Sequence, residues 1–92
     1  MADDKVRKRV VVYGKVQGVF FRDSVREKAR NEGVSGWVTN RDDGAVELVA
    51  EGPSEAVEAV VDYARRGPAR ADVERIDEQD ERPEGLSGFG VR

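Results

Sequence analysis

The apolar residues of this 92-residue chain change their spacing several times, and the order of those changes leaves few folds open. The spacing of the apolar residues in 6–13 predicts a β-strand, whose successive side chains point to opposite faces, with Val10 and Val12 on one face. Across residues 21–32 the apolar positions recur every four residues with charged residues between them, which predicts an amphipathic helix. Gly33 ends this helix, because glycine readily takes the left-handed conformation that follows a last helical turn.

A β-hairpin and a second helix are predicted next. Residues 36–40 and 45–51 have strand character, and the Asp-Gly pair in the connecting residues 41–44 is a strong signal for a turn. Residues 52–54 begin the second helix with a proline in its first turn, and residues 67–68 end it. The inner stripe of this helix consists of Val57, Val60, Val61 and Ala64.

The C-terminal part of the chain has weaker strand patterns. Residues 71–79 form a poorer strand candidate, because Val73 and Ile76 have opposite parity along it. We therefore expect either a β-bulge or a late start in that strand. Residues 82–85 form a turn or loop, and residues 89–91 alternate as a short terminal strand.

The order strand, helix, strand, strand, helix, strand, with a short fifth strand, predicts an α+β fold. Its expected form is a ferredoxin-like split βαβ (βαββαβ) sandwich, with a four- to five-stranded mixed or antiparallel sheet and two helices on one face. Sixteen valines against two leucines and one isoleucine also favour strands. We expect one domain over residues 1–92, with residues 1–5 frayed. The fold alone does not identify a function.

The composition excludes several kinds of active site. The chain has no cysteine and no histidine, so cysteine and histidine zinc sites, Ser-His-Asp triads and Cys-His pairs are all ruled out. The net charge of −3 argues mildly against nucleic-acid binding, and no apolar run approaches the length of a membrane span. We expect a cytoplasmic monomer with no nucleic-acid partner, no membrane segment, no metal and no cofactor.

The segment from Gly14 to Arg22 lies between a strand and a helix and is the most informative part of the chain. The N–H groups at such a helix start lack intrahelical acceptors, and the helix dipole adds positive charge, so the position suits an anion. Arg22 can supply a planar, permanently charged group for phosphate oxygens. The segment is neither a P-loop nor a dinucleotide-binding loop, and as generic chemistry a strand-to-helix turn with two glycines is more often an ordinary turn.

The predicted hairpin adds a second candidate residue. Asn40 ends its first strand, and an amide side chain both donates and accepts hydrogen bonds, so it is suited to hold a water molecule. The alternative is that Asn40 simply belongs beside an Asp-Gly turn. Asp42 and Asp43 are interpreted first as turn formers.

The stretches 14–22, 36–40 and 43–47 closely resemble the two motifs of the acylphosphatase family. The resemblance covers essentially the whole chain, including the helix entry at Gly52-Pro53 and the closing segment 87–89. It implies a small α/β sandwich that hydrolyses the carboxyl–phosphate bond of acyl phosphates without a metal, with inorganic phosphate or sulfate as competing anions.

By the same resemblance, Arg22 takes the role of the phosphate-binding arginine and Asn40 positions the attacking water. The family's phosphate-binding loop, which acts mainly through backbone N–H groups, corresponds to Lys15, Val16, Gln17, Gly18, Val19 and Phe20. Some members carry a small hydroxyl residue where this chain has Arg41, which leaves a secondary polar contact in question.

Three other functions remain as alternatives to the hydrolase. A regulatory domain that binds an anion without chemistry would keep the loop, but the intact Arg22 and Asn40 argue against it. An RNA-recognition module would need exposed aromatic residues on the sheet and a basic face. This chain has only six aromatic residues and a negative net charge, which argue against that module. An acylphosphatase-like module of a larger carbamoyl-transfer protein is disfavoured, because the chain ends after one domain.

Overall fold

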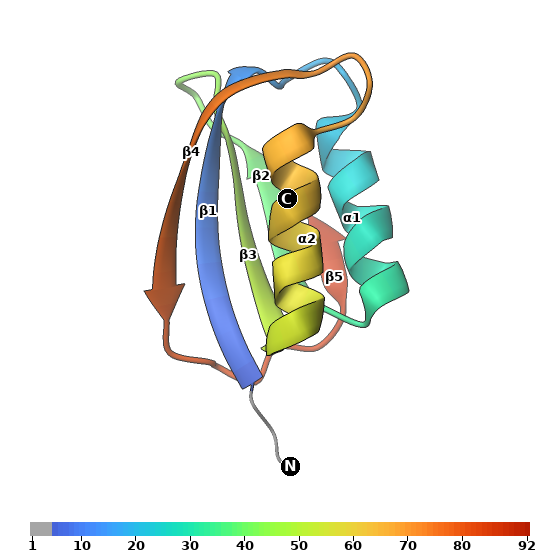
Figure 1. Cartoon of the computed structure of the whole chain (residues 1–92), viewed down its shortest axis with the longest axis vertical. Coiled ribbons are helices and arrows are strands. Elements are labelled where there is room, and N and C mark those ends of the chain that lie inside the picture. The colour runs from blue at the N-terminus through green and yellow to red at the C-terminus, as the bar shows by residue number, and fades with distance from the viewer. Residues whose placement is uncertain (1–4) are drawn as a thin grey trace.

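Both helices lie on one face of a five-stranded sheet in the computed structural model, which describes residues 5–92 (Figure 1). The elements are, in order, β1 (Lys5–Lys15), α1 (Phe21–Glu32), β2 (Ser35–Asn40), β3 (Val46–Pro53), α2 (Ser54–Arg66), β4 (Asp72–Glu81) and β5 (Phe89–Val91). The predicted helix over residues 21–32 is thereby confirmed. No helix within the described residues has both the length and the apolar character needed to cross a membrane.

The sheet has the strand order β4-β1-β3-β2-β5. β1 is antiparallel to both β3 and β4, and β2 is antiparallel to β3. β5 pairs in parallel with β2 and forms the edge of the sheet opposite β4. This is the mixed sheet of a ferredoxin-like split βαβ sandwich, so the fold class predicted from the sequence is confirmed.

The core between sheet and helices is built mainly from valine. Val10 and Val12 of β1 are fully buried, as their predicted face requires, and Leu48 of β3 lies fully buried beside them. The two helices contribute the predicted stripes, all almost or fully buried: Phe21, Val25, Ala29, Val57, Val60, Val61 and Ala64. Because β-branched side chains have few rotamers to lose, this composition suits a small domain that must order its core at low entropic cost.

The start of the chain and the entry to α2 differ from the prediction. Of the residues expected to be frayed, 1–4 lie outside the described part, while Lys5 already pairs with Pro53. Gly52 and Pro53 were predicted to open the helix, but they continue β3, and α2 begins at Ser54. Pro53 has φ −59° and ψ 142°, an extended conformation that proline tolerates at a strand end.

Gly14 was predicted to end the first strand, but β1 continues through Gly14 to Lys15. Gly14 has a φ of 128°, and a Cβ atom there would lie 2.2 Å from the carbonyl oxygen of Asp72. Only glycine therefore permits this close approach of β1 and β4.

The close approach coincides with the bulge expected in β4. Tyr13 pairs with Arg75 and Gly14 pairs with Val73, so Glu74 is the extra residue on β4. The bulge reverses the side-chain alternation, which lets Val73 and Ile76 both pack against the core despite their opposite parity. The β-bulge predicted from that parity is confirmed.

An ionic cluster lies at the end of the sheet where β1 begins. Arg7 and Glu51 are only 5% and 3% exposed, and Arg7 Nη1 lies 3.3 Å from Glu51 Oε1. Arg7 Nε also donates to Glu81 Oε1 at 2.9 Å. Both charges are thus almost removed from water but directly paired, which limits the desolvation cost.

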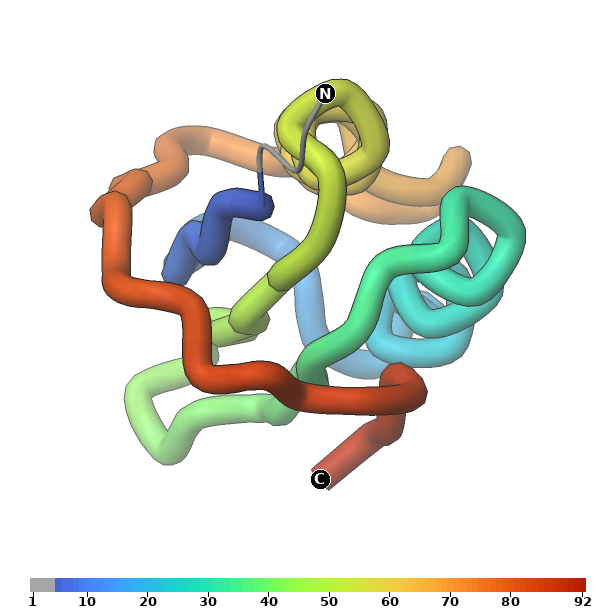
Figure 2. The backbone as a smooth tube through the Cα atoms, turned by 90° about the horizontal axis from the view of Figure 1, so that it is seen from below, coloured from blue at the N-terminus to red at the C-terminus, as the bar shows by residue number. Residues whose placement is uncertain are grey.

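The Glu51 carboxylate also holds the segment that runs from β4 to β5. Figure 2 shows this segment crossing the end of the sheet that is nearest the viewer. Glu51 accepts hydrogen bonds at 2.7–3.0 Å from the backbone N–H groups of Glu84, Gly85 and Leu86. Burial opposes its ionisation, but these N–H groups and the Arg7 guanidinium outweigh burial and keep the pKa of Glu51 below its ordinary value of 4.5.

We predict that Glu51→Gln lowers the free energy of unfolding at neutral pH by about 2–4 kcal/mol, because it breaks a buried ion pair and a buried acceptor cluster. A carboxyl group with a lowered folded-state pKa stabilises the fold above its unfolded pKa of 4.5, and this contribution is lost as pH falls below that value. The variant should therefore lose less stability than the parent protein on acidification.

Denaturant titrations at several pH values measure both effects. The matched control is Asp80→Asn, because the Asp80 side chain is 87% exposed and its removal should change stability by less than about 0.5 kcal/mol. Equal stabilities of the parent protein and Glu51→Gln at neutral pH would contradict the prediction.

Candidate active site

The chain passes from β1 to α1 through residues 16–20, and this loop turns its backbone outward. Val16 and Val19 are 0% and 6% exposed, so their side chains fix the loop to the core. Gly18 and Phe20 both have positive φ angles, 75° and 62°. The side chains of Val16 and Val19 point into the core, while Gly18 and Phe20 take left-handed conformations. We infer that the peptide groups of this short loop face the solvent.

Phe20 occupies the position before the first residue of α1 and has an unusual conformation. It is the one non-glycine residue with positive φ among the described residues, and its side chain is 72% exposed. Its carbonyl oxygen accepts the first helical hydrogen bond, from the Ser24 N–H at 3.0 Å, but its side chain caps nothing. Because such conformations are strained outside glycine, they are concentrated at functional sites.

The N–H groups of residues 16–20 are available to a ligand. Within residues 5–92, no backbone or side-chain acceptor receives a hydrogen bond from them. The first N–H groups of α1 are likewise without intrahelical acceptors, as at every helix start. Together with the positive end of the helix dipole, these donors form a site for an anion.

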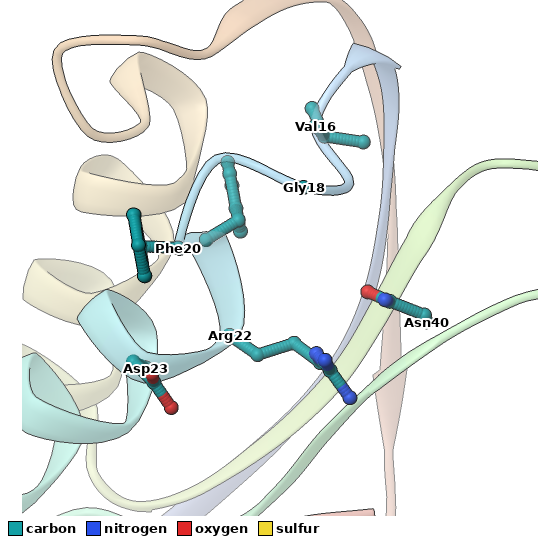
Figure 3. A pocket seen from close by; sticks show the side chains of 7 residues that line it. Val16, Gly18, Phe20, Arg22, Asp23 and Asn40 are labelled. Atoms are coloured by element: carbon teal, nitrogen blue, oxygen red, sulfur yellow. The ribbon is translucent and has the colours of Figure 1, made fainter.

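A pocket of about 270 Å³ lies beside this loop. It is lined by Val16, Gly18, Phe20, Phe21, Arg22, Asp23 and Asn40. Figure 3 shows the side chains of Arg22 and Asn40 extending toward one another from α1 and β2. The structure therefore brings together five of the eight predicted site residues: Val16, Gly18, Phe20, Arg22 and Asn40.

The other three predicted site residues do not line the pocket. Lys15 is the last residue of β1 and pairs with Asp72 of β4. The side chain of Val19 is buried in the core. Gln17 directs its side chain to the β2–β3 turn, where its Nε2 donates to the carbonyl oxygens of Arg41 and Ala45. The role predicted for Gln17 was mainly that of its backbone N–H group, so this side-chain contact was not predicted.

Arg22 is the basic group among the residues that line the pocket. Within the part of the chain that the structure describes, no carboxylate lies within ion-pair distance of its guanidinium. The one carboxylate that lines the pocket belongs to Asp23, which pairs with Arg26 at 3.3 Å. The positive charge of Arg22 is therefore uncompensated and faces the pocket.

Asn40 is held at its position by the end of the hairpin. It forms the last pair of β2 with β3, opposite Val46. Its side-chain amide has no hydrogen-bond partner among residues 5–92 and points into the pocket in Figure 3. An amide that is free to donate and accept is suited to orient a water molecule.

The turn that follows Asn40 is closed by the residues predicted to form it. The Arg41 N–H donates to the Ala45 carbonyl at 2.8 Å, and Asp43 Oδ1 accepts from the Ala45 N–H at 3.1 Å. The hydrogen bond from the Ala45 N–H lowers the pKa of Asp43, and the Arg41 guanidinium at 3.1 Å lowers it further. Asp43 is therefore a turn former, as predicted.

The arrangement suits a phosphate group and an attacking water. Main-chain donors and one guanidinium can surround the oxygens of a phosphate, while the neighbouring amide can hold a water beside it. Between residues 5 and 92 no three side chains of His, Cys, Asp or Glu converge as metal ligands would.

Comparisons with known proteins agree with this geometry. The family model described as Acylphosphatase matches residues 8–91 of this chain. An acylphosphatase of Haloarcula marismortui is 50% identical over 86 residues, which cover 94% of this chain and 94% of that protein. An acylphosphatase of Thermococcus kodakarensis is 51% identical over 87 residues, covering 95% and 96% of the two chains.

Solved structures give the same result. An acylphosphatase from Coxiella burnetii superposes with a TM-score of 0.91 at 41% identity. The superposition covers 96% of this chain and 93% of that chain, so the resemblance extends over whole domains.

Proposed function

The chain belongs to the acylphosphatase family and is an enzyme that hydrolyses acyl phosphates, and from this premise we propose that Arg22, Asn40 and the loop 16–20 form its active site. The observation that carries the proposal is the Arg22 guanidinium, which faces Asn40 across the pocket and, like the N–H groups of the loop 16–20, has no partner within residues 5–92. These groups differ in chemistry, and each suits one part of the reaction.

The phosphate group of the substrate binds to the loop and to Arg22. Phosphoryl transfer spreads charge over three oxygens, so several N–H donors and a planar guanidinium stabilise it better than one point charge. We propose that the backbone N–H groups of residues 15–20 supply the donors. Lys15 of β1 pairs with Asp72 of β4, so the Lys15 N–H lies at the edge of this group of donors.

Asn40 holds the attacking water in line with the bond that breaks. The water oxygen forms a bond to phosphorus, the bond between phosphorus and the carboxyl oxygen breaks, and the electron pair leaves with the carboxylate. The proton of the water passes to an oxygen of the substrate's own phosphate group. Fixing the water in this geometry replaces a random encounter with an oriented one.

The reaction runs without a general acid, because a carboxylate is a stable leaving group. This property matches a pocket whose side chains include no histidine or cysteine and whose only carboxylate, Asp23, pairs with Arg26. We propose that hydrolysis is independent of metal ions and that charge stabilisation by fixed donors supplies the rate enhancement.

We propose that the enzyme is a monomer. We further propose that it acts in the cytoplasm, where folding without disulfides is the rule and a chain with no cysteine is at no disadvantage.

We predict that the enzyme releases phosphate from benzoyl phosphate at the same rate with and without excess EDTA. Simple phosphate monoesters should react far more slowly, because their alkoxide leaving groups need a proton donor that the pocket lacks. Loss of activity in EDTA with recovery in magnesium would overturn the metal-free mechanism. Binding of phosphate with no turnover would identify an anion-binding domain.

We also predict that inorganic phosphate and sulfate inhibit competitively, because they satisfy the same N–H groups and the same guanidinium. Either anion at ten times its dissociation constant should stabilise the native state by about 1.4 kcal/mol, through binding to the folded form alone. Thermal unfolding in graded phosphate, with chloride at equal ionic strength as the control, measures this. An unchanged unfolding midpoint in phosphate would contradict the site.

The two side chains should differ in their kinetic effects. Arg22→Ala removes a contact made in both ground and transition states, so kcat/KM should fall at least ~10–100-fold and phosphate affinity should fall with it. Arg22→Lys should restore activity only in part, since an ammonium keeps the charge but loses the planar pair of donors. Asn40→Ala should lower kcat by roughly 10²–10³ with phosphate affinity nearly intact.

Steady-state kinetics with phosphate inhibition constants separate these outcomes, and circular dichroism checks the fold. The matched control for Arg22 is Lys28→Ala on the same helix, which removes only the surface ion pair with Glu32 and leaves the pocket residues unchanged. Near-normal kcat in Asn40→Ala would make Asn40 a turn residue, and normal kinetics in both variants would place the active site elsewhere.

A further inference from the structure

The side chain of Gln17 connects the two loops that carry the proposed catalytic groups. Its Nε2 donates to the carbonyl oxygen of Arg41 at 2.8 Å and to that of Ala45 at 2.9 Å. An amide nitrogen has two N–H donors, so both are used on the hairpin turn. Within residues 5–92, these are the only hydrogen bonds between the loop 16–20 and the turn 41–45.

The two acceptors lie at the base of the turn that follows Asn40. Arg41 is the next residue in the chain, and Ala45 accepts the N–H of Arg41 at 2.8 Å to close the turn. Gln17 thus binds both residues whose backbones close the turn, and these residues directly follow and precede the last β2–β3 pair, Asn40 and Val46. A shift of this turn relative to the loop would move Asn40 relative to the N–H groups that border the pocket.

The remaining bonds near Asn40 hold it within the sheet and not against the loop. Its backbone belongs to the β2–β3 ladder, and the neighbouring Thr39 donates through Oγ1 to the carbonyl oxygen of Arg92 at 3.1 Å. Among the described residues, Gln17 is therefore the direct polar link between the loop 16–20 and the turn 41–45, and the neighbouring Val16, which is buried, anchors it to the core.

We propose that Gln17 is a positioning residue, whose side chain sets the distance between the water held by Asn40 and the phosphate held by the loop. This inference rests on the roles proposed above for Asn40 and the loop. In-line attack is sensitive to such distances, because a displacement near 1 Å can lower a rate about a hundredfold. The Gln17 side chain need not touch the substrate to act in this way.

The variant Gln17→Met tests the inference, because methionine keeps nearly the same length and volume but offers no N–H donor. We expect kcat for benzoyl phosphate to fall by roughly tenfold or more, with the inhibition constant of inorganic phosphate unchanged within about twofold. Gln17→Asn, whose amide is one methylene shorter and cannot span both contacts, should show the same loss. It keeps the test valid if the methionine variant misfolds.

A double-mutant cycle with Asn40→Ala identifies the route of the effect. If Gln17 acts through Asn40, then Gln17→Met should change kcat by less than about twofold once Asn40 is absent. Thr39→Val is the matched control, because it removes the hydroxyl that donates to the Arg92 carbonyl at 3.1 Å and weakly to the Asn40 carbonyl at 3.4 Å but makes no contact with the loop 16–20; its kcat should stay within about twofold of the parent value.

The outcomes separate this inference from the proposed function. If Asn40→Ala lowers kcat but Gln17→Met and Gln17→Asn do not, or if the effects of Gln17 and Asn40 multiply, the positioning role is wrong while the active site stands. A weaker phosphate affinity in the Gln17 variants would also overturn it, because the side chain would then support the loop alone. If Asn40→Ala keeps a normal kcat, the role of Asn40 fails first, and the role of Gln17 fails with it.

Discussion

The proposed active site depends on how the chain leaves β1 and enters α1 within five residues. Val16 and Val19 are drawn into the core, and this hydrophobic anchoring forces the intervening backbone outward. A loop anchored at only one point would be free to turn its N–H groups toward protein acceptors. The left-handed residues Gly18 and Phe20 complete the turn. The anion site is therefore a consequence of core packing, in which apolar side chains orient polar main-chain groups.

The distribution of charge over the rest of the molecule gives Arg22 its distinct character. Elsewhere on β1, Arg7 forms ion pairs with three glutamates and Arg9 with two, which satisfy their guanidinium groups within the protein. Arg22 lies one residue inside α1, where the helix dipole already favours an anion, and has no such partner within the described residues. In a chain of net charge −3, the half-buried Arg22 guanidinium beside the N–H groups of the loop is a local positive site on an acidic protein.

The sequence predicted the order of elements, the core stripes and the β4 bulge, because these follow from short-range periodicity. It misplaced the ends of β1 and β3, since Gly14 and Gly52 signal a turn locally while their actual role depends on a neighbouring strand. The convergence of Arg22 and Asn40 came from family resemblance and not from spacing. The Gln17 contact was beyond prediction, because it joins residues 24 and 28 positions apart through a side-chain direction that no local pattern encodes.

The ionic cluster and the active site lie at opposite ends of the long axis of the molecule, which is 39 Å in extent (Figure 1). Glu51 and Arg7 stabilise the end where β1 begins, while the pocket is formed where β1 ends. Sites this far apart with no shared partners contribute independently to stability and function. A small domain with a modest stability margin gains from this separation. Among residues 5–92, the ionic cluster supports the fold without drawing the Arg22 charge into a structural pair, which leaves Arg22 available for the role proposed above.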